Sequence, residues 1–219
     1  MSENNYVNRY ITLTKKISLL EEKFGRDVKL ITVSKNQSYE KIIELKRLGQ
    51  NDFGENYVDE AYEKNIKISD TSISWHFIGK VQSNKIKKIC TLFDWIHTVS
   101  SSKHAIKIND SCNTLNKTMN ICIQINIDSE DSKNGIMLDE YDNLSSSIEN
   151  LSNIKLRGIM AIPKAGNDST EAFSKMYKLY KKHLNLDTLS MGMSSDFTSA
   201  IENGSNMLRI GQEIFGKRS

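Results

Sequence analysis

Eight strand-like segments, each followed by a helix-like segment, constrain the fold of this chain more than any other feature. Short apolar runs rich in β-branched residues alternate with stretches in which apolar residues recur every three or four positions. These two patterns indicate strands and helices respectively. Strict alternation implies a parallel sheet, and eight units imply an α/β fold closed into a single (β/α)8 barrel of the TIM type. The periodic segment 6–24 predicts an extra N-terminal helix.

The expected strands cover residues 30–35, 52–56, 75–79, 95–99, 120–127, 156–162, 189–193 and 207–211. The expected helices after them cover residues 38–48, 58–68, 83–92, 102–115, 136–151, 169–184, 194–203 and 212–215. An open, doubly wound sheet is the alternative, and its marker is a G-x-G-x-x-G turn after the first strand. The segment Lys35-Asn36-Gln37-Ser38 stands there instead, so the sequence favours the barrel.

Composition narrows the class of protein. The 219 residues show no break in composition, so we expect one domain over residues 1–219. The net charge of +3 and the lack of an arginine-rich stretch argue against binding nucleic acid. No run approaches the roughly 18 apolar residues of a membrane span, and the polar N-terminus does not resemble a signal peptide.

The three cysteines, Cys90, Cys112 and Cys122, are odd in number and lie far apart in the sequence. No Cys/His spacing typical of a metal site is present, so we expect no metal. The pattern predicts free thiols in a reducing compartment, and we expect a monomer in the cytoplasm.

Lys35 is the first candidate functional residue. It follows the apolar run Leu30–Ser34 at the carboxyl end of the first expected strand, which is the end where TIM barrels carry their chemistry. A partly desolvated lysine amine loses its proton and attacks an aldehyde to form a Schiff base. The competing interpretation is an ordinary solvated lysine.

The stretch 191–196, Met-Gly-Met-Ser-Ser-Asp, is a candidate phosphate-binding segment that begins at Met191. Its glycine lets the backbone approach a ligand, and Ser194 is expected to start a helix whose free amides face the barrel mouth. The competing interpretation is that Ser194 only caps that helix, with Asp196 favouring its dipole.

The last expected strand places Arg209 and Gly211 on one face and Leu208 and Ile210 on the other. If the apolar pair packs on helices, Arg209 points into the barrel and needs an anion or acceptor. Gly211 and Gln212 then offer amides where barrels commonly bind phosphate, in the loops after strands seven and eight. The alternative is that Arg209 pairs with an internal carboxylate such as Glu55.

Two further polar residues follow or lie within early strands. Asn56 either caps the following helix or donates a hydrogen bond to a ligand oxygen. His76 lies inside the third expected strand, where we expect a core histidine with satisfied hydrogen bonds.

Taken together, these residues predict a ligand with an aldehyde at one end and a phosphate at the other. Lys35 would take the aldehyde, and the loops after strands seven and eight would take the phosphate. Pyridoxal 5′-phosphate fits this description. A sugar phosphate bound by a Schiff-base aldolase is the alternative.

The chain resembles the pyridoxal phosphate homeostasis proteins (the YggS/PROSC family). The stretches that carry the resemblance occur in the family's order and cover nearly the whole chain. They are LITVSK at 30–35, FGENYVDE at 53–60, WHFIGKVQSNK at 75–85, INIDSEDSKNGI at 125–136, LRGIMAIP at 156–163, LSMGMSSDF at 189–197 and MLRIGQEIFGKR at 207–218.

The resemblance implies a barrel like the N-terminal domain of alanine racemase, with pyridoxal phosphate held on Lys35 as a Schiff base. It implies that Asn56 lies near the ring hydroxyl and Arg209 at the pyridine nitrogen. Ser194, Gly211 and Gln212 would hold the phosphate. Family members usually carry threonine after the R-I-G triplet, so the resemblance implies that Gln212 keeps the amide contact but does not offer the hydroxyl of threonine.

The resemblance and the chemistry together predict a carrier of the cofactor rather than an enzyme. An arginine at the ring nitrogen does not keep that nitrogen protonated, so the ring is a poorer electron sink than one paired with aspartate. A racemase needs an acid or base on each face of its substrate, and we expect no second domain here to supply one. Apo forms of enzymes that use the cofactor are the expected transient partners. A racemase-like enzyme remains the alternative.

Overall fold

The computed structural model describes residues 5–129, 134–164 and 168–216. Within these ranges, eight parallel strands pair in chain order, and β8 pairs back with β1 to close a barrel. The strands are β1 (Lys29–Val33), β2 (Asp52–Glu55), β3 (Ser74–Phe77), β4 (Trp95–Val99), β5 (Met119–Ile125), β6 (Ile154–Ala161), β7 (Thr188–Ser190) and β8 (Met207–Ile210).

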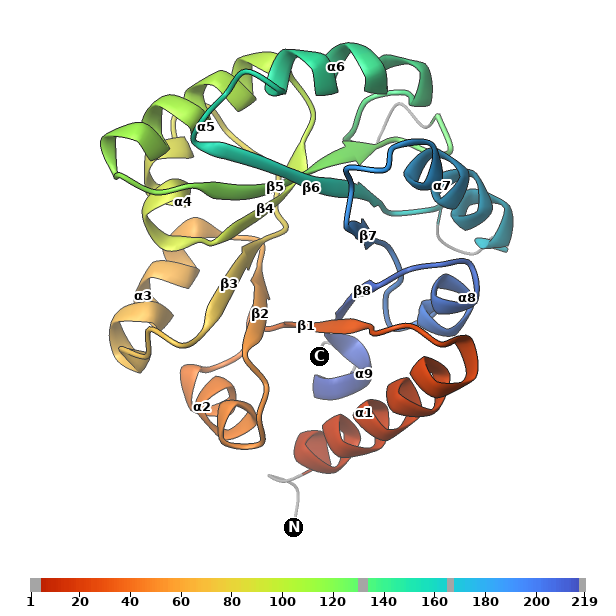
Figure 1. Cartoon of the computed structure of the whole chain (residues 1–219). Helices are drawn as coiled ribbons and strands as arrows, with labels where there is room; N and C mark the ends of the chain where they lie inside the picture. Colours follow the sequence, from red (N-terminus) through yellow and green to blue (C-terminus); the bar gives the residue numbers. More distant parts are fainter. Residues whose placement is uncertain (1–4, 130–133, 165–167, 217–219) are drawn as a thin grey trace.

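A helix follows each strand, and the helices ring the barrel in Figure 1. They are α1 (Asn5–Phe24), α2 (Tyr39–Arg47), α3 (Val58–Ile68), α4 (Ile86–Leu92), α5 (Ser102–Thr114), α6 (Tyr141–Ile148), α7 (Thr170–Lys182), α8 (Phe197–Glu202) and α9 (Gln212–Phe215). A 3-10 turn, Leu138–Glu140, precedes α6. The predicted (β/α)8 barrel with an extra N-terminal helix is therefore confirmed.

Buried apolar side chains form two separate layers. The larger layer lies between the strands and the helices and contains, for example, Ile42 and Leu45 of α2. The smaller layer fills the barrel interior with Ile31, Trp95, Cys122, Met160 and Met207. Strand alternation produces this division, because successive side chains of a strand point to opposite faces. Each fully buried Ile or Leu contributes roughly 1.5–3 kcal/mol of transfer free energy.

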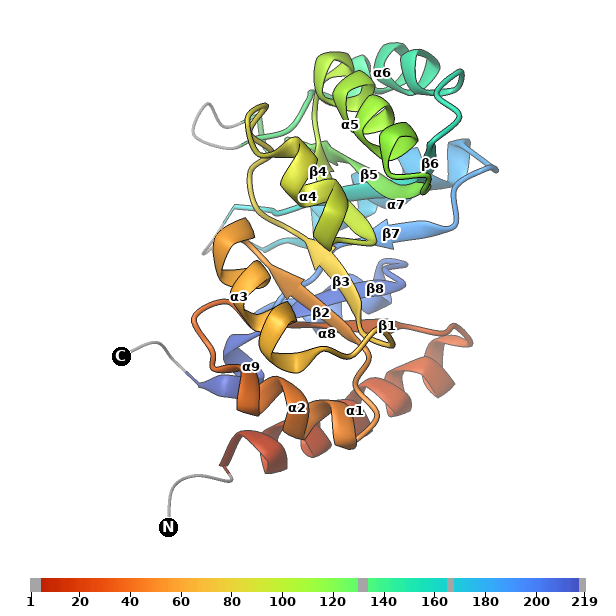
Figure 2. The same cartoon turned by 90° about the vertical axis from the view of Figure 1, so that its left-hand side faces the viewer.

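The N-terminal helix α1 covers the place where the barrel closes. It packs along α9 and α8, and the two ends of the described chain lie side by side in Figures 1 and 2. Its buried residues, Tyr10, Leu13 and Ile17, recur every three or four positions and so form one apolar stripe. Without α1, the parts of α8 and α9 that it covers would be open to water.

Several strands end earlier than the apolar runs suggest. β1 ends at Val33, β5 at Ile125 and β7 at Ser190, two or three residues before their expected ends. The residues that follow belong to loops, and some of them, such as Lys35 and Met193, line a cavity at this end of the barrel. Residues 130–133 and 217–218 of the motif stretches lie outside the described residues.

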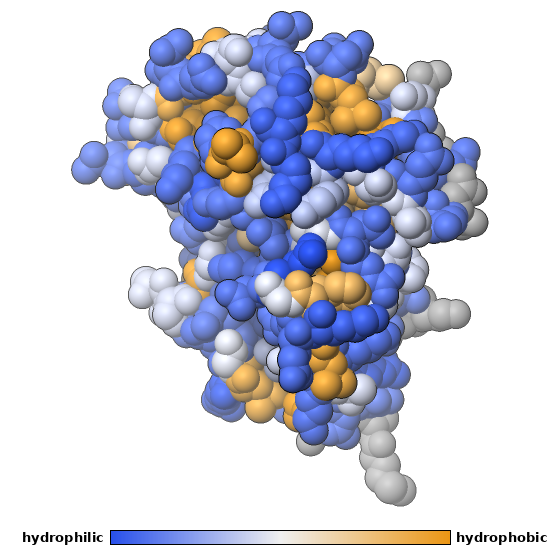
Figure 3. Space-filling model, turned by 45° about the vertical axis from the view of Figure 1, so that its right-hand side comes forward, coloured by the Kyte–Doolittle hydropathy of each residue, from blue (hydrophilic) through white to orange (hydrophobic). Residues whose placement is uncertain are grey.

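The outer surface is largely hydrophilic on the face shown in Figure 3, where hydrophobic patches are separated by polar side chains. Cys90, Cys112 and Cys122 are all buried and free, which confirms the prediction of free thiols. Among the described residues, no helix has both the length and the apolar character needed to cross a membrane, and no cluster of His, Cys, Asp or Glu is suited to a metal ion.

Candidate functional site

A cavity of about 470 Å³ opens at the carboxyl-terminal end of the strands. This volume falls in the range typical of small-molecule sites. Six of the seven predicted site residues line it, from segments distant in sequence: Lys35, Asn56, Ser194, Arg209, Gly211 and Gln212. The barrel fold therefore brings the predicted aldehyde-binding and phosphate-binding elements to one place.

Lys35 lies in a tight turn directly after β1. The Gln37 amide donates to the Ser34 carbonyl across this turn at 3.0 Å, and Asn36 adopts the left-handed conformation with φ of 60°. Asparagine tolerates this conformation better than most residues. The turn sets the backbone direction at Lys35, whose side chain lines the cavity.

A network of charged side chains holds the backbone on both sides of Lys35. We call it the outer network, because it lies between the barrel and α3; it comprises Ser34, Glu55, Glu60 and Lys64. The Lys64 ammonium donates to the Ser34 carbonyl at 2.7 Å, to Glu55 at 2.7 Å and to Glu60 at 2.6 Å. The Ser34 hydroxyl donates to Glu55 at 2.7 Å.

The other flank of Lys35 is fixed by the same network, because the Asn36 amide donates to Glu60 at 2.6 Å. Glu55 is fully buried, and this burial raises the pKa of its carboxyl although Lys64 opposes the shift. The charges of α3 are thus used to fix the turn that presents Lys35.

The suggested ion pair between Arg209 and Glu55 is wrong. β2 alternates so that Glu55 faces α3 and bonds Lys64, whereas Arg209 lies inside the barrel. Arg209 donates from Nη1 to the Ser190 hydroxyl at 2.7 Å and from Nη2 to the Ala161 carbonyl at 2.9 Å. Burial lowers the pKa of the guanidinium to about 10, so it remains a cation at neutral pH.

The segment after β7 is a series of turns rather than a helix start. α8 begins only at Phe197 with Asp196 as its N-cap residue, so the expectation that Ser194 starts the helix is wrong. The Asp196 carboxylate accepts from the Met193 amide at 2.6 Å, which bends the chain. The Ser194 hydroxyl accepts from the Glu213 amide at 3.1 Å and thereby ties the β7 loop to the start of α9.

Two glycines allow the close approach of these loops. Gly192 has φ of +97°, and a Cβ there would lie 2.6 Å from the Ala200 side chain. A Cβ at Gly211 would lie 2.9 Å from the Val33 carbonyl of β1. Side chains at either position would push the loops after β7 and β8 away from the strands, so these positions require glycine.

Asn56 does not cap α3, whose N-cap residue is Tyr57. Its side-chain oxygen is buried and, among the described residues, has no hydrogen-bond partner. A buried polar atom without a partner is costly, and Asn56 lines the cavity. The unsatisfied oxygen is therefore available to a ligand.

Met191 is the one predicted site residue that does not line the cavity. Its side chain is fully buried in the core between strands and helices, and its amide donates to the Met207 carbonyl. Met193, two residues later, lines the cavity in its place, together with Val33, Ile78, Ile162, Ser195 and Glu213. The apolar members carry no signal in sequence, since only closure of the barrel shows which strand ends meet.

His76 is a core histidine with satisfied hydrogen bonds, as predicted. It is fully buried, bonds Asp52 and His97, and stacks on Trp95 with ring centroids 5.5 Å apart. It does not line the cavity.

Comparison with known proteins identifies the family. The family described as alanine racemase, N-terminal domain, matches residues 11–219. The chain is 44% identical to the pyridoxal phosphate homeostasis protein of Pasteurella multocida over 202 residues, which is 87% of each chain. It is 37% identical to the protein of the same name from Escherichia coli K12, covering 98% of this chain and 97% of that protein.

Solved structures agree with this relationship. PipY of Synechococcus elongatus PCC7942, solved with PLP bound, has a TM-score of 0.86 at 30% identity and covers 97% of this chain and 100% of its own. Alanine racemase of Clostridium difficile 630 has a TM-score of 0.72 at 16% identity over 94% of this chain and 56% of its own, which is a likeness of fold. This chain belongs to the family of pyridoxal phosphate homeostasis proteins, built on the alanine racemase N-terminal domain.

Proposed function

We propose that this chain is a single-domain carrier that holds pyridoxal phosphate as a Schiff base on Lys35. Through this binding it takes part in the intracellular homeostasis of the cofactor and in the balance of amino acids and keto acids. The observation that carries the proposal is the joint lining of one cavity by Lys35 and by the β7 and β8 loops. An amine and a group of anion-binding donors thus share a space of the right size for one small molecule.

The residues present fit this cofactor. The Asn56 side-chain oxygen is buried and unsatisfied at the cavity, where it would accept from the ring hydroxyl. Ser194 and the amides at Gly211 and Gln212 lie at the phosphate side, and Gly211 leaves that backbone uncovered. Arg209 keeps its charge and would donate a hydrogen bond to the pyridine nitrogen.

The chemistry of attachment requires only Lys35 and the aldehyde. Pyridoxal phosphate would supply the aldehyde and Lys35 the neutral amine, and the two would condense with loss of one water molecule. The turn at residues 34–37 and the outer network hold the backbone that carries the amine, while Arg209 and the loops after β7 and β8 would orient the ring.

The same arrangement argues for a carrier without strong catalysis. Bound pyridoxal phosphate supplies an electron sink, and its strength depends on protonation of the ring nitrogen. Arg209 would donate a hydrogen bond while retaining its own proton, so it would leave that nitrogen unprotonated. We therefore propose that the protein stores the cofactor and passes it to apo-enzymes that use it.

Reduction with borohydride tests the attachment site. Purified protein mixed with pyridoxal phosphate should develop a visible absorption band, and borohydride followed by peptide mapping should place the label on Lys35. Lys35→Ala should abolish both signals. Lys80→Ala is the matched control, because Lys80 is an exposed lysine that follows β3 at the same end of the barrel. Labelling of wild type at another lysine would refute the site.

Racemase turnover tests the second part of the proposal. The loaded protein should convert L-alanine to D-alanine no faster than the free cofactor does. Turnover well above that rate, lost in Lys35→Ala, would show an enzyme instead. A colourless protein that takes up a sugar phosphate would favour a Schiff-base aldolase.

A further inference from the structure

A continuous chain of hydrogen bonds crosses the barrel interior from the cavity to the opposite end. Arg209 Nη1 lies 2.7 Å from Ser190 Oγ, which lies 3.0 Å from His97 Nδ1. His97 Nε2 lies 3.0 Å from His76 Nδ1, and His76 Nε2 lies 3.0 Å from Asp52. We call this set of five side chains the inner relay.

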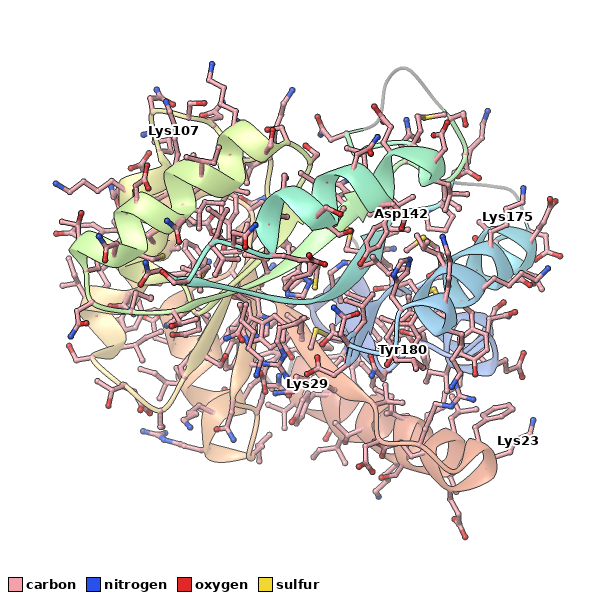
Figure 4. The ribbon with its side chains drawn as sticks, turned by 45° about the horizontal axis from the view of Figure 1, so that its top comes forward. Lys23, Lys29, Lys107, Asp142, Lys175 and Tyr180 are labelled. Carbon is pink, nitrogen blue, oxygen red and sulfur yellow. The ribbon has the colours of Figure 1, made fainter. Side chains whose placement is uncertain are left out.

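Only the two ends of the inner relay reach beyond the barrel core. Ser190, His97 and His76 are completely buried, and Arg209 is 4% exposed at the floor of the cavity. The Asp52 side chain is 16% exposed at the amino-terminal edge of β2 and pairs with Lys29 at 3.0 Å. Lys29, the first residue of β1, is labelled in Figure 4 among the strands, whereas Lys23, Lys107 and Lys175 project from the outer helices.

The chemistry of the two ends fixes the direction of every hydrogen bond. Arg209 can only donate and ionised Asp52 can only accept. Each ring between them is neutral, because burial lowers the pKa of both His76 and His97. Each of the four hydrogen bonds then contains one proton. Arg209 donates to Ser190, Ser190 to His97, His97 to His76, and His76 to Asp52. Both rings must carry their proton on Nε2.

We propose that the inner relay is a positioning device for Arg209, which couples the guanidinium at the cavity floor to Asp52 at the far end of the barrel. The proposal rests on the proposed function, in which Arg209 contacts the ring of pyridoxal phosphate. The hydrogen bonds that connect His97, His76 and Asp52 to the cavity lining run through Ser190 and Arg209. They would act on the cofactor only through that arginine.

The direction of the hydrogen bonds explains how the coupling works. Each group that donates its proton toward Asp52 becomes a stronger acceptor for the next group, because hydrogen bonds in series polarise one another. The Asp52 charge therefore strengthens the Ser190 oxygen as an acceptor for Arg209. Loss of that charge loosens the guanidinium without altering any residue in contact with the cofactor.

Nitrogen NMR of the histidine rings tests the direction of the relay. The chain has four histidines, and the variants His104→Gln and His183→Gln assign the two outside the barrel. We expect His76 and His97 to be neutral and protonated on Nε2 at pH 7. A cationic ring, or a proton on Nδ1 of either ring, would overturn the relay.

Asp52→Asn tests the coupling, with Asp187→Asn as its control. Asp187 precedes β7 at the same end of the barrel but pairs with Arg157 and lies outside the relay. Asp52→Asn should shift the ring signals of His97 and the Nε–H signal of Arg209, and weaken pyridoxal phosphate binding about fivefold, at the lower end of couplings between distant sites. Asp187→Asn should do neither. Equal effects of the two variants, or none, would refute the coupling.

Ser190→Ala interrupts the relay from the other end. It should uncouple the His97 signals from Arg209 and weaken cofactor binding at least as much as Asp52→Asn, and Ser190→Thr should restore both by restoring a hydroxyl. Failure of Ser190→Thr to restore the His97 signals would contradict the relay. The ring and guanidinium measurements need no cofactor, so a wild type that failed to bind pyridoxal phosphate would refute the proposed function alone.

Discussion

Two polar networks lie beneath the cavity, and they use residues of the same short strand in opposite ways. β2 sends Glu55 outward to Lys64, which also pairs with Glu60 in the outer network, and Asp52 inward to His76 in the inner relay. The outer network is ionic and lies behind the turn that carries Lys35. The inner relay has charges only at its ends and neutral rings between them, and it ends at Arg209.

The difference follows from solvation. The helix layer can admit a lysine whose stem runs along the apolar core while its ammonium reaches three acceptors. The barrel interior has no such route, so a polar group there must be neutral or placed at an end. We therefore expect the outer network to contribute most to the free energy of unfolding. We expect the inner relay to affect the pH dependence of stability and the affinity for pyridoxal phosphate.

Removal of Lys64 should have the largest effect. Lys64→Met leaves the buried Glu55 carboxylate without its counter-ion and should lower the free energy of unfolding by about 3–5 kcal/mol, as measured by urea denaturation. Lys85→Met is the control, because Lys85 forms an exposed pair with Asp59 and exposed pairs contribute little to stability. Similar losses in the two variants would show that the outer network is not needed for stability.

The inner relay should give the stability a distinctive pH dependence. The folded-state pKa values of His76 and His97 are lowered below the 6.5 of the unfolded chain. The unfolded state therefore gains protons first as the pH falls, and stability declines below about pH 6.5. The slope approaches about 1.4 kcal/mol per pH unit for each ring that stays neutral. Urea denaturation from pH 7.5 to 5.5 measures it, and a flat profile would mean that the rings can be charged inside the fold.

Asn56→Ala should affect ligand binding in the cavity without the loss of stability expected when either network is broken. The side-chain oxygen of Asn56 has no hydrogen-bond partner among the described residues, so Asn56→Ala should change the free energy of unfolding by less than about 1 kcal/mol. The same variant should weaken pyridoxal phosphate binding about tenfold, which corresponds to about 1.4 kcal/mol of binding free energy. Asn206→Ala is the matched control. Asn206 accepts from the Leu189 amide and donates to the Asp187 carbonyl, so its loss should destabilise the protein by about 1–3 kcal/mol. The reverse ranking would contradict the assignment of Asn56 to a ligand.

Gln212→Thr should have the smallest effect. Gln212 starts α9 with an exposed side chain at the cavity rim, and the amides of this segment remain whichever residue stands there. We expect the affinity for pyridoxal phosphate to change by less than about threefold, well under 1 kcal/mol. A tenfold gain, measured by fluorescence titration, would mean that a hydroxyl is needed at this position.

The sequence predicted the elements well and the loops less well. Periodicity located the helices and strands, since both depend on short-range patterns of apolar residues. It misplaced the start of α8, because the Asp196 carboxylate bends the chain back onto the Met193 amide and delays the helix to Phe197. It also named Met191 where Met193 lines the cavity, because β7 ends early and its register against β8 decides which side chain faces inward.

The sequence likewise predicted some features of the candidate site and missed others. Lys35, Asn56, Ser194, Arg209, Gly211 and Gln212 could be named from their positions after expected strands, and all six line the cavity. The partners of Glu55 and Arg209 could not be named, because the sequence places both on strands but does not show which face of the barrel each strand turns inward.

By itself, the sequence determined the alternation of strands and helices, the barrel that eight such units form and the rim residues that gather at one end. Tertiary structure alone decided which buried charges meet: Lys64 with Glu55 outside the barrel, and Arg209 with Asp52 through Ser190 and two histidines inside it. The physical reason is the separation along the chain of the residues that interact. Backbone patterns depend on residues a few positions apart, whereas burial of a charge requires a partner from any part of the chain that closure of the barrel brings within hydrogen-bonding distance.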